Sequence, residues 1–170
     1  MKIARKIKNR RGFTLAETLM AVLILLMVSA IVAAGIPLAK EAYDKAVDAA
    51  NAQTLLSTTM TMLRGELSEA KVVDKTATSL TYRSGKTGSS VTLCRGEDDD
   101  SDATNGIQLK DVTGDSRPLV TSEAATIRLH TTFESVDYND GIFTITGLKV
   151  VKGDMELTSI TPFTVKTVNP

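Results

Sequence analysis

The sequence predicts an α+β protein in which one long N-terminal helix precedes an antiparallel β-sheet. Three observations predict this arrangement. Residues 13–39 are almost entirely apolar, and residues 40–71 repeat apolar side chains at intervals near three and four. Residues 74–170 are rich in Thr, Val, Ile, Gly and Asp, with stretches that alternate apolar and polar positions. Helix followed by successive strands is typical of the α+β class.

The apolar segment 13–39 is long enough to cross a membrane. It reads FTLAETLMAVLILLMVSAIVAAGIPLA and contains one ionisable side chain, Glu17. At ~1.5 Å per residue it makes a helix of roughly 40 Å, against a hydrocarbon core of ~30 Å. Residues 1–12 carry six lysines and arginines and no acid. The positive-inside rule therefore places the N-terminus in the cytoplasm and the body outside it.

Placing the Glu17 carboxylate in lipid costs free energy, so a positively charged partner is expected for it. A carboxylate at the centre of a membrane helix costs about 2.5–3.5 kcal/mol, and less near the helix end, where Glu17 lies. Cleavage between Gly12 and Phe13 would create an α-amino group about one helical turn away. With subunits side by side, Glu17 of one chain would meet the Phe13 amine of the next. Such a pair fixes axial register more than it adds stability.

This junction resembles the type IV prepilin signal, in which a basic leader ends in Gly and is followed by Phe-Thr-Leu-x-Glu and an apolar helix. The matching positions are Gly12, Phe13, Thr14, Leu15 and Glu17. The resemblance implies that a prepilin peptidase cuts after Gly12 and methylates the Phe13 amine. It also implies that Glu17 pairs with a neighbouring N-terminus during assembly. It covers about the first thirty residues.

The resemblance implies a structural subunit of a type IV pilus or pseudopilus-like filament, serving adhesion, motility, secretion or DNA uptake, and not an enzyme. Its implied partners are the prepilin peptidase, other pilin or pseudopilin subunits and the inner-membrane assembly platform. Its implied location is the cell membrane, as a single-pass protein with a cytoplasmic N-terminus, and then an extracellular or periplasmic filament. The implied domains are a leader (1–12), a transmembrane assembly helix (13–39), an amphipathic helix (40–73) and an extracellular, β-rich, pilin-like body (74–170).

Two other classes remain open. The first is a membrane-anchored extracellular binding or sensor domain that never polymerises; it predicts an uncut N-terminus and no dependence on Glu17. The second is a secreted binding or enzymatic domain released by a cut near Ala34. The apolar region is about twice as long as the ~7–15 residues of a secretory signal, which disfavours that second class.

Beyond the membrane, residues 40–71 predict an amphipathic helix. Its expected apolar stripe consists of Tyr43, Val47, Ala50, Leu56, Met60, Leu63, Leu67 and Ala70. Strands are expected at 79–83, 91–95, 107–112, 126–133, 142–151 and 155–168. Turn signals at residues 139–141 and 152–154 join the last three strands into an antiparallel meander.

The body offers few candidates for chemistry. Without the six leader bases, 14 basic residues face 20 acidic ones, so residues 13–170 carry about −6 and show no electrostatic footprint for nucleic acid. Asp98, Asp100 and Asp102 of the acidic cluster 97–102 are weak Ca²⁺ candidates. They lack the Gly and Glu that complete a calcium loop, so a solvated loop without cofactor is expected.

The lone cysteine and the lone histidine suggest no active site. Cys94 excludes an intrachain disulfide and is expected to be a small buried residue. His130 falls in an alternating strand beside Arg128 and Thr132, so it is expected to face solvent. No serine–histidine–acid arrangement has local support in the sequence.

Overall fold

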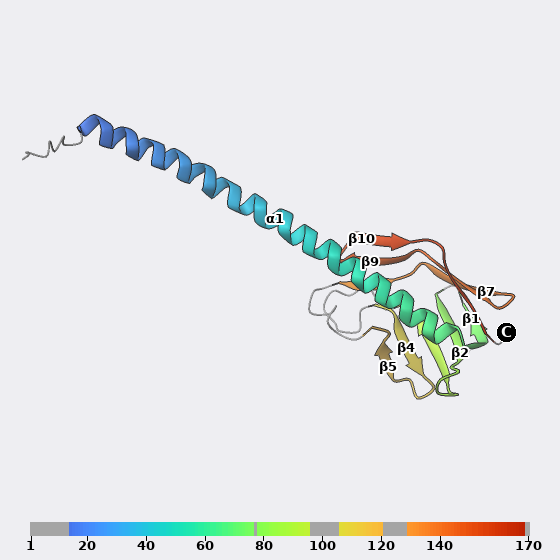
Figure 1. Ribbon diagram of the computed structural model, residues 1–170. Helices are drawn as coiled ribbons and strands as arrows, with labels where there is room; N and C mark the ends of the chain where they lie inside the picture. Colours follow the sequence, from blue (N-terminus) through green and yellow to red (C-terminus); the bar gives the residue numbers. More distant parts are fainter. Residues whose placement is uncertain (1–13, 77, 96–105, 121–128, 169–170) are drawn as a thin grey trace, which may run out of the picture. The chain divides into compact units, whose positions relative to one another are not determined.

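The computed structural model describes residues 14–76, 78–95, 106–120 and 129–168 (Figure 1). The leader, the Gly12–Phe13 junction and the acidic cluster 97–102 lie outside these ranges. The chain divides into two compact units, residues 1–45 and 46–170, which are described separately.

One helix, α1, runs from Leu15 to Leu67 and continues through Pro37. Within the first unit its apolar side chains are exposed, and in the described chain α1 is the one helix long and apolar enough to cross a membrane. The helix ends earlier than the expected residue 71. The reason is that β1, Lys71–Lys75, contains adjacent valines and pairs with the following strand, so tertiary pairing ends the helix.

In the second unit α1 buries a stripe on one face. Its members are Ala52, Leu55, Leu56, Thr59, Leu63 and Leu67. Leu56, Leu63 and Leu67 confirm the prediction, and Ala70 is buried just beyond the helix. The start of the predicted stripe is wrong: Tyr43 and Val47 are 69% and 37% exposed, and Ala50 is exposed. Periodicity identifies a face of the helix, but it does not show where the neighbouring sheet begins.

The first sheet has five antiparallel strands in the order β1-β2-β3-β4-β5. After β1 these are β2 (Ser79–Arg83), β3 (Ser90–Cys94), β4 (Gln108–Asp111) and β5 (Ser116–Pro118). Strands β2, β3 and β4 confirm the expected strands to within one residue or two. Strand β5 was not expected, because it has three residues and ends in a proline; such a strand is tolerated at a sheet edge, where it lies here.

The remaining strands form two three-stranded antiparallel sheets, ordered β10-β9-β6 and β11-β8-β7. Their bounds are β6 His130–Thr132, β7 Ser135–Asn139, β8 Ile142–Thr146, β9 Leu148–Lys152, β10 Met155–Ile160 and β11 Phe163–Lys166. The expected meander keeps its order, with residues 142–152 in the middle. The expected strands 142–151 and 155–168 are nevertheless each divided between the two sheets, as β8 and β9 and as β10 and β11. Of the expected strand 126–133, residues 126–128 lie outside the described ranges and residues 130–132 form β6, whereas β7 was not expected.

The divisions lie next to one another and form a crease, defined here by Glu134, Gly147 and Thr161–Pro162. The Glu134 amide donates to the Thr146 carbonyl (2.9 Å), and the Gly147 amide donates to the Thr161 hydroxyl (3.0 Å). Gly147 has φ +66°, and a Cβ there would come 2.5 Å from side-chain carbons of Glu134. Pro162 has no N–H for a ladder. These residues interrupt strands whose alternation otherwise looks continuous.

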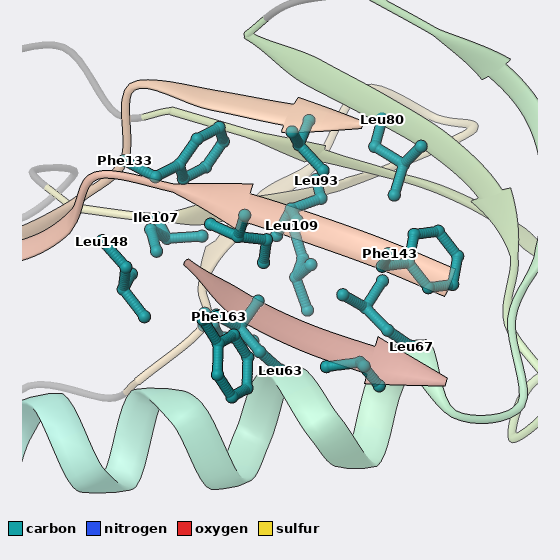
Figure 2. Packing of buried hydrophobic residues seen from close by; sticks show 14 of the residues in the cluster. Leu63, Leu67, Leu80, Leu93, Ile107, Leu109, Phe133, Phe143, Leu148 and Phe163 are labelled. Carbon is teal, nitrogen blue, oxygen red and sulfur yellow. The ribbon is translucent and has the colours of Figure 1, made fainter. Parts of the chain in front are cut away.

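A single core connects α1 to all three sheets. Figure 2 shows Leu63 and Leu67 of the helix directed toward Phe163, Leu109 and Phe143. Tyr82, Phe133 and Phe143 are the largest fully buried side chains. Burying one such side chain contributes about 1.5–3 kcal/mol, so the core accounts for the packing of the helix against the strands.

Candidate functional site

The described part of the N-terminal site is the first turn of α1. The Thr14 amide and hydroxyl both donate to Oε2 of Glu17, at 3.0 and 3.1 Å. The Glu17 amide donates back to the Thr14 hydroxyl at 3.3 Å. This reciprocal pattern is a capping box, with Thr14 at the N-cap and Glu17 at the third helical position. It satisfies amides at the start of the helix that have no partner within the helix itself.

The capping box gives Glu17 a role within its own helix that was not predicted from the sequence. Its signal was nevertheless present as Thr14-x-x-Glu17 directly before an apolar run. The carboxylate also lies at the positive end of the helix dipole, where an anion is favoured. Among the described residues, no hydrogen bond ends on Oε1 of Glu17. One oxygen therefore caps the helix, and the other is available to a further donor.

The remaining N-terminal predictions concern residues beyond the described ranges. Gly12 and Phe13, the expected cleavage pair, are among them. Glu17 and the neighbouring side chains Leu15, Leu19 and Met20 are exposed in the single chain. The processing role of Gly12 and Phe13 and the assembly role of Glu17 stay predictions.

The acidic candidates Asp98, Asp100 and Asp102 also lie outside the described residues, so their calcium role stays a prediction. Within the described ranges, no three His, Cys, Asp or Glu side chains gather in a way that could hold a metal ion. Asp111 instead uses its carboxylate to close its own turn. It accepts hydrogen bonds from the amides of Thr113 (2.9 Å) and Asp115 (3.1 Å).

Cys94 is a half-buried thiol at the end of β3. Its Sγ lies 3.7 Å from the Gln108 carbonyl, to which it donates. Burial raises the pKa of the Cys94 thiol, and the charge of Lys110 opposes this shift. The thiol is therefore protonated near neutral pH, and a protonated thiol is a poor nucleophile.

His130 is half-buried rather than solvent-facing as expected. It does share a strand face with Thr132, as the alternation predicted, but Thr132 is only 4% exposed. This face is recessed between β6, β9 and the end of β3, which are far apart in the sequence, so local alternation gave no indication of it.

Comparison with known proteins adds a match at the N-terminus. Residues 7–33 match the family described as the prokaryotic N-terminal methylation motif. No curated protein and no solved structure gives a significant match to the chain. The matched range contains the Gly12–Phe13 junction and the Thr14–Glu17 capping box, and it leads into the long apolar helix. The chain therefore carries the prepilin-type N-terminal signature at the head of an α+β fold.

Proposed function

We propose that this chain is a structural subunit of a type IV pilus or a pseudopilus-like filament. The observation that carries the proposal is the methylation motif at residues 7–33, placed at the start of an exposed apolar helix. The helix continues into a folded β-rich body, which gives the chain both an anchor and a soluble part. Such a subunit polymerises through the apolar helix and presents its body on the outside.

In this proposal the prepilin peptidase cuts between Gly12 and Phe13 on the cytoplasmic face and methylates the new amine. The basic leader stays in the cytoplasm by the positive-inside rule, and the body lies in the periplasm or outside the cell. The assembly platform of the inner membrane then extracts the processed subunit. The body contributes no catalytic step.

Glu17 acts in this proposal as a two-sided acceptor. Its Oε2 accepts from Thr14 of its own chain, at 3.0 and 3.1 Å. A carboxylate has about four lone-pair sites, so Oε1 can accept from the Phe13 amine of a neighbour without loss of the cap. Two charges that meet away from water must be matched in position. The pair therefore sets the axial register between subunits.

The experiment is mass spectrometry of the surface-exposed or filament-derived protein. The expected mature N-terminus is an N-methylated Phe13. An uncut N-terminus would instead favour the membrane-anchored sensor or binding domain, and a start beyond Ala34 would favour a secreted domain.

A matched pair of variants tests the register role. Glu17→Gln keeps a side-chain oxygen for the Thr14 cap but removes the charge, so it is expected to be processed normally and to fail to enter filaments. Glu41→Gln removes an exposed helix acid whose ion pair, within the described residues, is with Lys45 on the same helix face, at 2.7 Å. It is expected to be incorporated normally. Normal incorporation of Glu17→Gln would reject the role proposed for this carboxylate.

A further inference from the structure

Tyr43 of α1 differs from the other aromatic residues in its surroundings. Its side chain is 69% exposed. Every other aromatic side chain in the described ranges belongs to the core or packs against it, namely Tyr82, Phe133, Tyr138, Phe143 and Phe163. A tyrosine combines an apolar ring with a polar hydroxyl, and such side chains concentrate where a membrane meets water. The position of Tyr43 relative to the ends of the apolar segment is therefore informative.

Two ionisable side chains bound the uncharged part of α1. Residues 18–39 contain no ionisable group, with Glu17 before them and Lys40 after them. At ~1.5 Å per residue this stretch spans roughly 33 Å, close to the ~30 Å thickness of a hydrocarbon core. A membrane span that begins after Glu17 and ends before Lys40 therefore fits the lipid and leaves neither charge inside it.

Lys40 and Tyr43 are neighbours at the outer end of this span. They are three residues apart on one helix, so they share a face, with Tyr43 about 4.5 Å farther along the axis. Lys40 forms no ion pair within the described part of the chain, whereas Nζ of Lys45 lies 2.7 Å from Oε1 of Glu41. The Lys40 ammonium is therefore available to an external anion, and lysines at the ends of apolar helices extend toward lipid headgroups.

We propose that Lys40 and Tyr43 together bind phospholipid headgroups at the outer face of the membrane and so fix the depth of the free subunit. The Lys40 ammonium donates to a phosphate oxygen of the lipid, and the Tyr43 ring lies at the headgroup level with its hydroxyl toward water. The proposal rests on the membrane location in the proposed function, and it does not depend on cleavage or polymerisation.

This anchor also determines where Glu17 lies before assembly. With Lys40 at the outer interface, the length of residues 18–39 places Glu17 at the inner one. Its carboxylate then stays hydrated and avoids most of the cost of a charge in the hydrocarbon core. The Gly12–Phe13 junction precedes Glu17 in the chain, so it is also outside the hydrocarbon core, on the cytoplasmic side where the peptidase of the proposed function acts.

The chain contains no tryptophan, so one introduced indole can report its own depth. Full-length Tyr43→Trp, Val28→Trp and Val112→Trp are each reconstituted into phosphatidylcholine vesicles at a low protein-to-lipid ratio, where subunits stay apart. Fluorescence is quenched by lipids that carry bromine either near the headgroup or near the end of the acyl chain. Tyr43→Trp is expected to be quenched at least about twofold more by the shallow bromine than by the deep one.

The other two variants calibrate the depth. Val28 is 53% exposed and lies near the middle of residues 18–39, so Val28→Trp should be quenched more by the deep bromine. Val112 is 74% exposed in the β4–β5 turn of the body, so Val112→Trp should be quenched by neither.

Loss of the two side chains tests whether they set the depth. In the Val28→Trp background, Lys40→Gln with Tyr43→Ala should let the helix move along its axis, so the ratio of deep to shallow quenching should fall by about half. Glu41→Gln with Lys45→Gln removes two charges that neutralise each other, at 2.7 Å, and is the matched control. It should keep the parental ratio.

The results separate the anchor from the membrane span. If Val28→Trp is quenched but Tyr43→Trp is not, or if the ratio for Val28→Trp is unchanged without Lys40 and Tyr43, the anchor is overturned and the span stands. A Tyr43→Trp signal that is unquenched in vesicles and moves to shorter wavelength in filaments would assign the ring to a neighbouring subunit instead. Absence of quenching in Val28→Trp would reject the membrane location itself, and the anchor with it.

Discussion

Replacing Gly85 by alanine should destabilise the body, because the β2–β3 loop passes unusually close to the chain just after α1. A Cβ at Gly85 would lie 2.4 Å from the Glu69 Cβ and 2.8 Å from the Glu69 carbonyl oxygen. Ordinary contacts of this kind begin at about 3.4 Å, so loop and chain must separate by roughly 1 Å. Neither atom is the end of a flexible side chain, so rotation of Glu69 cannot relieve the contact.

The expected cost is that of forcing an extra carbon into a packed site, about 1–3 kcal/mol. The same loop is held to the helix by Lys86, whose Nζ lies 2.9 Å from Glu66 Oε1, so separation at Gly85 also strains this ion pair. For a body of this size, each kcal/mol lowers the melting temperature by roughly 3–5 °C. The assay is thermal unfolding in detergent micelles, monitored by circular dichroism in the near-UV for the tyrosines and in the far-UV for the β-structure.

Gly65→Ala is a matched control with the opposite sign. Gly65 lies inside α1, and a Cβ there would meet only Nζ of Lys86, at an ordinary 3.6 Å. The same chemical change should therefore stabilise the helix, by up to about 1 kcal/mol. If Gly85→Ala melts at or above the parental temperature while Gly65→Ala behaves as expected, the loop at Gly85 does not lie in rigid contact with Glu69.

Three further predictions follow from the packing and the charges. Leu63→Ala, at a fully buried site, should cost about 2–5 kcal/mol of unfolding free energy in urea titrations. The adjacent Met62→Ala, 48% exposed, should cost less than about 1 kcal/mol, and equal costs would contradict the assigned helix face. Asp137 on β7 accepts from Lys75 on β1 at 2.6 Å, and this hydrogen bond leads the causes that lower the pKa of its carboxyl. A lowered pKa stabilises the fold above the ordinary aspartate value near ~4 and ceases to do so as pH falls through the lower, folded value. Asp137→Asn should therefore melt below the parent at pH 7 and with it near pH 2, whereas a constant difference at every pH would exclude the ion pair as the cause. Cys94, whose pKa is raised by burial, should react slowly with iodoacetamide at pH 7.5 in the folded protein and quickly in urea; equal rates would show that the thiol is not protected.

The elements that depend on local pattern were predictable from the sequence. Residues 15–67 carry a helical signal that the structure continues through Pro37, and the β2–β3 hairpin shows alternation on both sides of a Gly-rich turn. The N-terminal motif could also be identified from the sequence, because its residues are adjacent in the chain and each residue type has a chemical role there. The methylation-motif match over residues 7–33 supports that reading.

The features that depend on distant residues were not predictable. The helix ends at Leu67 because residues 71–75 pair with β2, a choice that local propensity does not determine. The recess around His130 needs β6, β9 and the end of β3 together. Within the second unit, the exposure of Val47 depends on how far the sheets extend along the helix. In each case the structure of a segment is determined by the distant residues that pack or pair with it, and not by its own sequence.

The crease has a consequence for how this body tolerates insertions and deletions. Phe143 and Ile145 are the inward residues before Gly147, and Leu148 and Val150 are the inward residues after it, so the parity of inward positions changes from odd to even at the glycine. Loss of Gly147 would shift Leu148 and Val150 to odd positions, so both halves would alternate in one phase, as in a single straight strand. The second half would then keep its pairing with β10 and β6. Length changes at Gly147 therefore act on the angle between two small sheets, whereas length changes within β8 or β9 exchange core side chains for solvent-facing ones.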